Sequence, residues 1–201
     1  MNKNIIRSLA ISGAVLISSV ALAGCTINLG SSDSDKNSGM MGNNGMMGNS
    51  SSSSTFSGSD IMFAQMMIPH HQQAVDMGTL AETRALSPEV KALAAKIKSE
   101  QSPEITQMKG WLKDANASMD MGHDMGMGGM LSDSQMKALE NAKGAEFDKL
   151  YLQGMIAHHQ GAIAMADLIA QSTNPEAKKL AEAIVTGQTA EIATMQKLLG
   201  Q

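Results

Sequence analysis

The sequence predicts an all-α protein whose folded part is a four-helix bundle made of two duplicated helical hairpins. Three observations predict this fold. From Asp60 onward the apolar residues recur at helical spacing; Gly, Pro and Ser divide this region into segments of helix length; and its first half is repeated in its second half. Each amphipathic segment has one apolar stripe to bury, and four such stripes are buried most simply against one another in a bundle.

Capping residues and prolines set the boundaries of the expected helices. Pro88 and Pro175 stand where a first helical turn tolerates proline, and Ser87 and Asn174 precede them as caps. Ser132 is a suitable cap for a short additional helix. We expect helices over residues 60–85, 88–114, 133–143, 145–171 and 175–199.

An internal repeat relates the two halves at an offset of 88 residues. Met67-Ile68-Pro69-His70-His71-Gln72 corresponds to Met155-Ile156-Ala157-His158-His159-Gln160. After a gap of one residue, Gln101 and Glu104 correspond to Gln188 and Glu191. The connection between the halves has about 30 residues, which is long enough for the crossover of a ferritin-like bundle. An up-and-down bundle is the alternative.

Residues 1–24 have the pattern of a lipoprotein signal peptide. Lys3 and Arg7 precede an apolar run that ends in Leu22-Ala23-Gly24-Cys25, and the run is too short for a comfortable membrane span. We expect cleavage before Cys25 and acylation of its thiol, which would anchor the chain to a membrane. The alternative is an uncleaved anchor.

The rest of the chain divides into a tether and one domain. Ser, Gly, Asn, Asp and Met dominate residues 25–58, which we expect to be a disordered tether that starts at the lipidated Cys25. Residues 59–201 are expected to be the bundle domain, with a methionine-rich loop at 116–131.

The expected mature chain is acidic. Cleavage of residues 1–24 removes two of the 15 basic residues and none of the 19 acidic ones, which leaves a net charge of −6. This charge argues against nucleic-acid binding.

Methionine and histidine share one helix face in each half of the repeat. Met67, His70, His71 and Met77 lie on this face in the first half, with Met66 at its edge. In the second half the same face carries Met155, His158, His159 and Met165. A Met followed by His at i+3 and i+4 brings a thioether and two imidazoles within reach of one ion. The alternative is that Met fills the core and His bonds to carboxylates.

The residue types on this face favour a soft metal. Di-iron bundles place Glu-x-x-His on two helices, whereas here a methionine stands three residues before His70 and before His158. Thioether sulfur favours Cu(I), and imidazole binds both copper states. Glu104 and Glu191 would each still supply a carboxylate, so binding of a harder metal ion is the alternative.

Further methionines lie outside any periodic helix face. Because the single cysteine is expected to be acylated, methionine is the soft ligand that remains. We expect accessory metal ligands at Met66 on the edge of the first helix face, and in the loops at Met40, Met41, Met46, Met47, Met119, Met121, His123, Met125, Met127 and Met130. Low-complexity drift or a flexible contact surface is the alternative.

The segment from about Asp60 to Leu199 resembles the bacterial "domain of unknown function 305" family. The resemblance rests on the repeated Met-Ile-x-His-His-Gln and on the Gln-x-x-Glu-Ile-x-x-Met that follows each copy. It implies a ferritin-like four-helix bundle, exported or periplasmic, in a family linked to copper binding and copper tolerance. The motif residues carried over by position are the four methionines and four histidines of the two helix faces.

These features predict an extracytoplasmic, lipid-anchored protein that sequesters or transfers Cu(I) or Cu(II) through Met and His, contributing to copper tolerance or homeostasis. Its expected partners are copper ions, the membrane, and a copper exporter or other cuproprotein. The domain would lie in the periplasm or at the cell exterior, anchored to the cell membrane or the outer membrane. A metal-dependent oxidoreductase of ferritin-like type and a structural bundle without metal are the alternatives.

Overall fold

The computed structural model describes residues 55–120 and 128–200, and it confirms the all-α fold. Its helices are α1 (Gly58–Arg84), α2 (Pro88–Asp114), α3 (Asp133–Asn141), α4 (Ala145–Ala166) and α5 (Pro175–Leu198). A 3-10 turn, η1 (Asp167–Ile169), follows α4, so the α-helical part ends earlier than the expected residue 171. Within the described ranges, none of the helices has the length and apolar character needed to cross a bilayer.

The helices begin at the caps that the sequence indicates. The side chains of Ser87 and Asn174 each accept two backbone N–H groups at the start of α2 and α5, and a proline follows each cap. Ser132 caps α3. At α1, Ser57 and Asp60 form a reciprocal capping box, so this helix begins two residues before the expected position.

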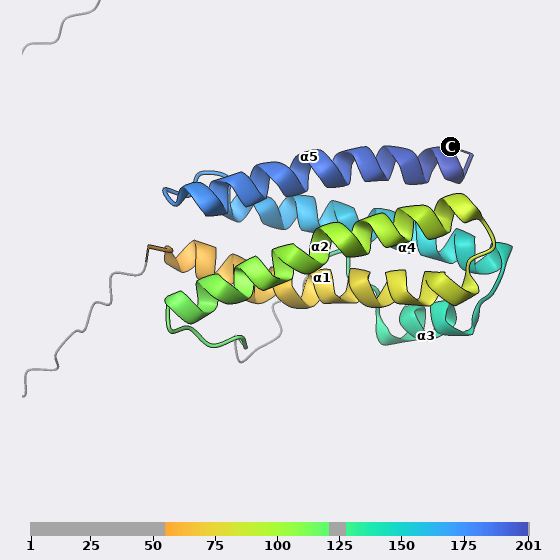
Figure 1. The fold of residues 1–201 in the computed structure, drawn as a ribbon, viewed down its shortest axis with the longest axis horizontal. Helices are drawn as coiled ribbons and strands as arrows, with labels where there is room; N and C mark the ends of the chain where they lie inside the picture. Colours follow the sequence, from red (N-terminus) through yellow and green to blue (C-terminus); the bar gives the residue numbers. More distant parts are fainter. Residues whose placement is uncertain (1–54, 121–127, 201) are drawn as a thin grey trace, which may run out of the picture. The chain divides into compact units, whose positions relative to one another are not determined.

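The two hairpins are joined in the ferritin-like manner (Figure 1). Helices α1 and α2 form one antiparallel hairpin, and α4 and α5 form the other. The Gly144 N–H at the start of α4 donates to the Arg84 carbonyl at the end of α1, at 2.8 Å. Helices α1 and α4 are therefore antiparallel, and the connection from α2 to α4 starts and finishes at opposite ends of the bundle. The up-and-down alternative is wrong.

The core consists of two hydrophobic clusters, with the four motif histidines between them. Phe63, Ala64, Met67 and Ile68 of α1 belong to the first cluster together with Trp111 and Ile169. Ala74, Met77 and Ala81 of α1 belong to the second cluster together with Phe147 and Tyr151. Helix α4 passes the two clusters in the opposite order, as an antiparallel neighbour must. The histidines thus form a polar layer across the middle of the bundle.

The folded part extends slightly beyond the expected domain boundary at residue 59. Phe56 is buried and stacks on Trp111 with ring centroids 5.0 Å apart. The Asn174 side chain donates to the Thr55 carbonyl at 3.1 Å. Phe56 thereby joins the first cluster, and Asn174 holds the backbone at Thr55. The earlier tether and the signal segment lie outside the described residues.

The crossover lies directly on the bundle at residues 128–131, which we call the strap. The Leu131 N–H donates to the Gln73 side chain at 2.7 Å, and Gln73 donates back to the Leu131 carbonyl at 2.9 Å. Gly129 has a φ of +86°, and a Cβ atom on Gly161 of α4 would overlap the Gly128 carbonyl oxygen. Glycine at position 161 therefore lets the strap lie against α4.

Replacing Gly161 with alanine is expected to push the strap off α4. Although alanine is the better helix former, the clash with the Gly128 carbonyl outweighs its gain of about 1 kcal/mol. We expect a lower melting temperature and faster amide hydrogen exchange at Leu131. The matched control is Gly187→Ala on α5, where a Cβ meets no atom within 4 Å and stability should not fall. Equal effects of the two substitutions would contradict this packing.

Candidate functional site

The repeat brings its two histidine motifs face to face at the α1–α4 contact. His70 on α1 and His158 on α4 have ring centroids 3.8 Å apart and ring planes inclined by 36°. His70, His71, His158 and His159 are all fully buried. Imidazoles are seldom placed in an apolar core without a partner, so each ring nitrogen at this layer has to be accounted for.

The outer histidine of each motif bonds to a carboxylate of its own hairpin. His71 Nε2 lies 2.7 Å from Glu104 of α2, and His159 Nε2 lies 2.8 Å from Glu191 of α5. The expected alternative of histidine bonding to carboxylates is thus confirmed for these two residues. A carboxylate holds the proton on Nε2, which leaves Nδ1 as a lone pair. Both Nδ1 atoms are buried without a hydrogen-bond partner.

The inner pair, His70 and His158, is less well satisfied. His70 Nε2 donates to the Gly128 carbonyl of the strap over a long 3.3 Å. Neither ring nitrogen of His158 makes a hydrogen bond of good geometry. Burial and the adjacent His71 lower the pKa of His70 to about 3, and burial and His70 lower the pKa of His158 well below its usual value. Near neutral pH both rings are therefore neutral, the form in which imidazole binds a metal.

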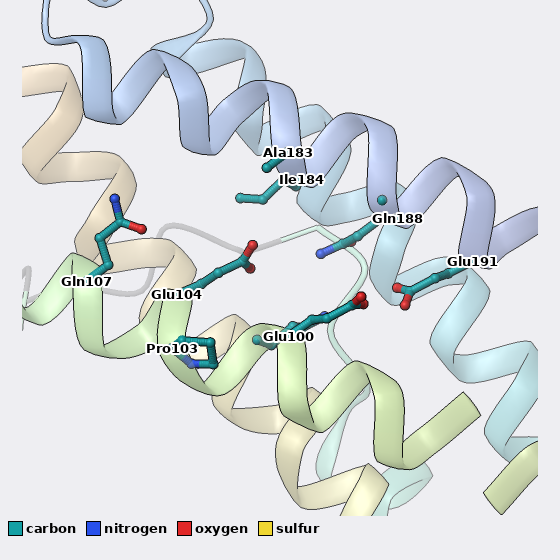
Figure 2. Close-up of a pocket in the computed structure, with 10 residues that line it drawn as sticks. Glu100, Pro103, Glu104, Gln107, Ala183, Ile184, Gln188 and Glu191 are labelled. Carbon is teal, nitrogen blue, oxygen red and sulfur yellow. The ribbon is translucent and has the colours of Figure 1, made fainter. Parts of the chain in front are cut away.

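A cleft of about 420 Å³ lies between α2 and α5, beside the two histidine–carboxylate pairs (Figure 2). Glu104 and Glu191 both line it. Burial alone would raise the pKa of Glu191, but hydrogen bonds from His159 and Lys96 lower it to about 2. Gln101 and Gln188 also line the cleft. The sequence analysis assigned no role to these two glutamines, although their equivalence in the repeat indicated that they occupy matching positions.

The motif methionines pack in the hydrophobic clusters on either side of the histidine layer. Met67 is fully buried in the first cluster, and Met77 and Met155 are fully buried in the second. Met66 is also buried, whereas Met165 is partly buried against the first cluster. Core filling by methionine is thus part of their role. Met67 and Met155 stand one helical turn before the histidines of α1 and α4, whereas Met77 and Met165 stand about two turns after them.

The described residues contain no ready-made cluster of His, Cys, Asp and Glu ligands. In residues 55–120 and 128–200, no three His, Cys, Asp or Glu side chains come together closely enough to hold a metal ion. The inner rings also lie against each other instead of pointing their edges at a common centre. A shared ion would therefore require ring rotation and sulfur ligands.

Of the accessory ligands predicted in the loops, Met119 and Met130 lie within the described residues. Met119 is 55% exposed, whereas Met130 on the strap is partly buried. The remaining candidates lie outside the described residues: Met40, Met41, Met46, Met47, Met121, His123, Met125 and Met127, as well as the lipidation candidate Cys25.

A duplicated helical hairpin with a histidine layer across its core defines a class of small ferritin-like bundle proteins. The chain belongs to the family described as "Domain of unknown function (DUF305)", which matches residues 60–199. The resemblance noted in the sequence is therefore confirmed. No curated protein sequence matches the chain significantly.

Solved structures of this family have the same fold. A Streptomyces coelicolor protein described as secreted is 35% identical, with a TM-score of 0.68, covering 71% of this chain and 92% of that one. A Deinococcus radiodurans fragment is 31% identical, with a TM-score of 0.66, covering 72% and 97%. A protein named CopM in its Cu(I)-bound form is 34% identical, with a TM-score of 0.59, covering 69% and 94%. CopM has also been solved with Cu(II) and with silver.

The lowered histidine pKa values predict that the metal-free domain loses stability in mild acid. Below pH 6.5 the unfolded chain binds protons that buried His70 and His158 do not, so stability falls as the pH drops. Each histidine contributes up to about 1.4 kcal/mol per pH unit. Urea unfolding between pH 6.5 and pH 5, above the range where carboxylates titrate, measures the slope. The double variant His70→Asn, His158→Asn should flatten it, and an unchanged slope would contradict the assignment.

Proposed function

We propose that this chain is an exported copper-binding protein that sequesters or transfers Cu(I), and also Cu(II), through the histidine layer and its flanking methionines. The observation that carries the proposal is the inner pair, His70 and His158. Two neutral imidazoles face each other in the core with nitrogen atoms that lack hydrogen-bond partners. A buried lone pair without a donor is costly, and a bound metal ion would satisfy it.

The chemistry around the pair favours a soft ion. Carboxylates bond to the outer histidines, and in residues 55–120 and 128–200 no three His, Cys, Asp or Glu side chains gather closely enough to hold a metal. The additional ligands available next to the inner pair are methionine thioethers, which prefer Cu(I). In the outer pairs, a carboxylate bound to Nε2 orients a histidine for metal binding at Nδ1, as is common around metal centres.

The comparison with CopM supports the same ligand. That protein shares this fold and has been solved with Cu(I), Cu(II) and silver bound, and silver is another soft cation. The alternative with support in the structure is a purely structural role, in which the His71–Glu104 and His159–Glu191 bonds tie each hairpin together. Copper affinity, measured separately from stability, distinguishes the two.

Removing the motif residues is expected to weaken copper binding. A chain beginning at Thr26 is titrated with Cu(I) against a colorimetric chelator under anaerobic conditions. The double variants His70→Ala, His158→Ala and Met67→Leu, Met155→Leu should each lower the affinity about tenfold or more. Met→Leu nearly conserves volume, so the second variant should stay folded.

Met136→Leu on α3 is the matched control, because this methionine lies outside the motif and should leave the affinity unchanged. If both double variants bind Cu(I) as tightly as the parent while only their melting temperatures fall, the histidine layer is structural.

The alternative of a metal-dependent oxidoreductase is tested in the same preparation. Oxygen consumption by the copper-loaded chain that is lost in the His70→Ala, His158→Ala variant would favour it.

We further propose that the chain is exported and held at a membrane by an acylated Cys25. The signal pattern before Cys25 supports this, as does the similarity to a Streptomyces protein described as secreted. Stable anchoring requires more than one acyl chain, and a lipoprotein cysteine carries several. A cell-membrane or outer-membrane location, and a copper exporter or other cuproprotein as partner, are parts of the same proposal.

Labelling cells with an alkyne-tagged fatty acid is expected to tag the chain at Cys25 and to recover it in the membrane fraction. Cys25→Ser should lose the label and the membrane association together, because Cys25 is the chain's single cysteine. A substitution that leaves the lipobox intact, Ser53→Ala, serves as the control. Membrane recovery of Cys25→Ser at the parental level, without label, would contradict lipid anchoring.

A further inference from the structure

The two helices that form the cleft, α2 and α5, are equivalent in the repeat, but they carry different side chains at equivalent positions. On α2, the Lys96 ammonium bonds to Glu100 at 2.6 Å and reaches across to Glu191 of α5 at 2.8 Å. At the offset of 87 that relates these helices, Lys96 and Glu100 correspond to Ala183 and Gly187. These short residues cannot reach across the cleft. One half therefore lacks the lysine that the other half has.

Glu104 is the carboxylate that this difference leaves without a cation. It corresponds to Glu191, bonds to His71 through one oxygen, and keeps 21% of its side chain exposed. No Lys or Arg of residues 55–120 and 128–200 lies within ion-pair distance of it. Figure 2 shows Glu104 extending across the cleft toward Ala183 and Ile184. Glu191 is paired with the ammonium group of Lys96, whereas the equivalent position beside Glu104 is open to the cleft.

The part of the cleft beside Glu104 is open, and the cleft is large enough for a small molecule. A Cβ atom built on Gly187 would meet nothing within 4 Å. The whole cleft measures about 420 Å³, within the range of ligand sites. Its wall at this half is formed by Glu104, Ala183 and Gly187 together with flanking residues of both helices.

Two buried amides in the wall lack hydrogen-bond partners. Gln101 is 3% exposed and neither of its amide atoms is bonded, and Gln188 is 4% exposed with an unbonded Oε1. Figure 2 shows the Gln188 amide extending into the cleft, and a half-turn of this amide directs Oε1 there. Buried amides normally make hydrogen bonds, so the Oε1 atoms of these two glutamines would be satisfied by a ligand that donates hydrogen bonds.

We propose that this half of the cleft binds a primary ammonium group, with Glu104 as its counter-ion and the amide oxygens of Gln101 and Gln188 as further acceptors. Lys96 supplies the same group to Glu191 in the other half, which defines the chemistry of the ligand. A compact amine and a lysine side chain of another protein both present this group. A divalent cation is the competing occupant, because carboxylate and amide oxygens also bind hard cations, and the comparison of magnesium chloride with sodium chloride distinguishes the two.

The test uses metal-free chain beginning at Thr26, whose folded unit lies within residues 49–201. Calorimetric titrations with 1,4-diaminobutane and with Nα-acetyl-lysine amide are expected to show saturable binding that added salt weakens. Tighter binding of the diamine indicates a free amine as ligand, and tighter binding of the lysine derivative indicates a lysine of a protein partner. Glu104→Gln should weaken either one about tenfold, because it removes a charge-assisted hydrogen bond.

Ala183→Lys provides a second variant that keeps Glu104 and its bond to His71. It restores the missing lysine at the position equivalent to Lys96, so it should fill the site and abolish amine binding. Glu182→Gln, at an exposed position next to it, is the matched control and should bind as the parent does. The proposal is overturned if neither amine binds saturably, if both site variants bind normally, or if magnesium chloride at equal ionic strength competes better than sodium chloride. Because no copper is present, its failure is separate from failure of the copper proposal.

Discussion

The contact between α1 and α4 at the histidine layer is the constraint on which the rest of the structure depends. Four imidazoles are buried where the two hairpins meet, between two apolar clusters. Burial of polar rings is costly unless their nitrogens are bonded. The outer rings meet this requirement through carboxylates of α2 and α5, so the layer determines which side chains those helices must present. The inner rings are left partly unsatisfied, and this is the feature that a soft metal would complete.

The same constraint explains why the cleft between α2 and α5 is polar. Because Glu104 and Glu191 must face inward to reach the histidines, the helices that carry them frame a space lined by carboxylates and amides. Lys96 neutralises one side of this space, and the repeat has no equivalent lysine on the other. Duplication built a symmetric scaffold, and later substitution made its two halves chemically different. The strap adds a second asymmetry, since Gly128 accepts a hydrogen bond from His70 and from no other motif histidine.

Much of the fold could be predicted because its signals are local. Ser87 and Asn174 cap the helices that the prolines begin, and the apolar spacing marks the faces that are buried. The ends that were predicted less well depend on distant contacts. Phe56 is ordered because it stacks on Trp111, and no local pattern near residue 56 indicates that partner. Likewise, Met130 is partly buried because the strap is held by Gln73, which stands 57 positions earlier in the sequence.

By itself, the sequence determined the helices, the duplication and the pairing of each Met with two His, because helical periodicity and an internal repeat can be read from neighbouring residues. It left open both the crossover and the partners of each histidine. Only the tertiary structure decided that His70 meets His158, that Glu104 and Glu191 bond to the outer rings, and that Ala183 leaves Glu104 without a lysine. These outcomes depend on which helix faces which across the bundle, and packing of whole hairpins sets that arrangement.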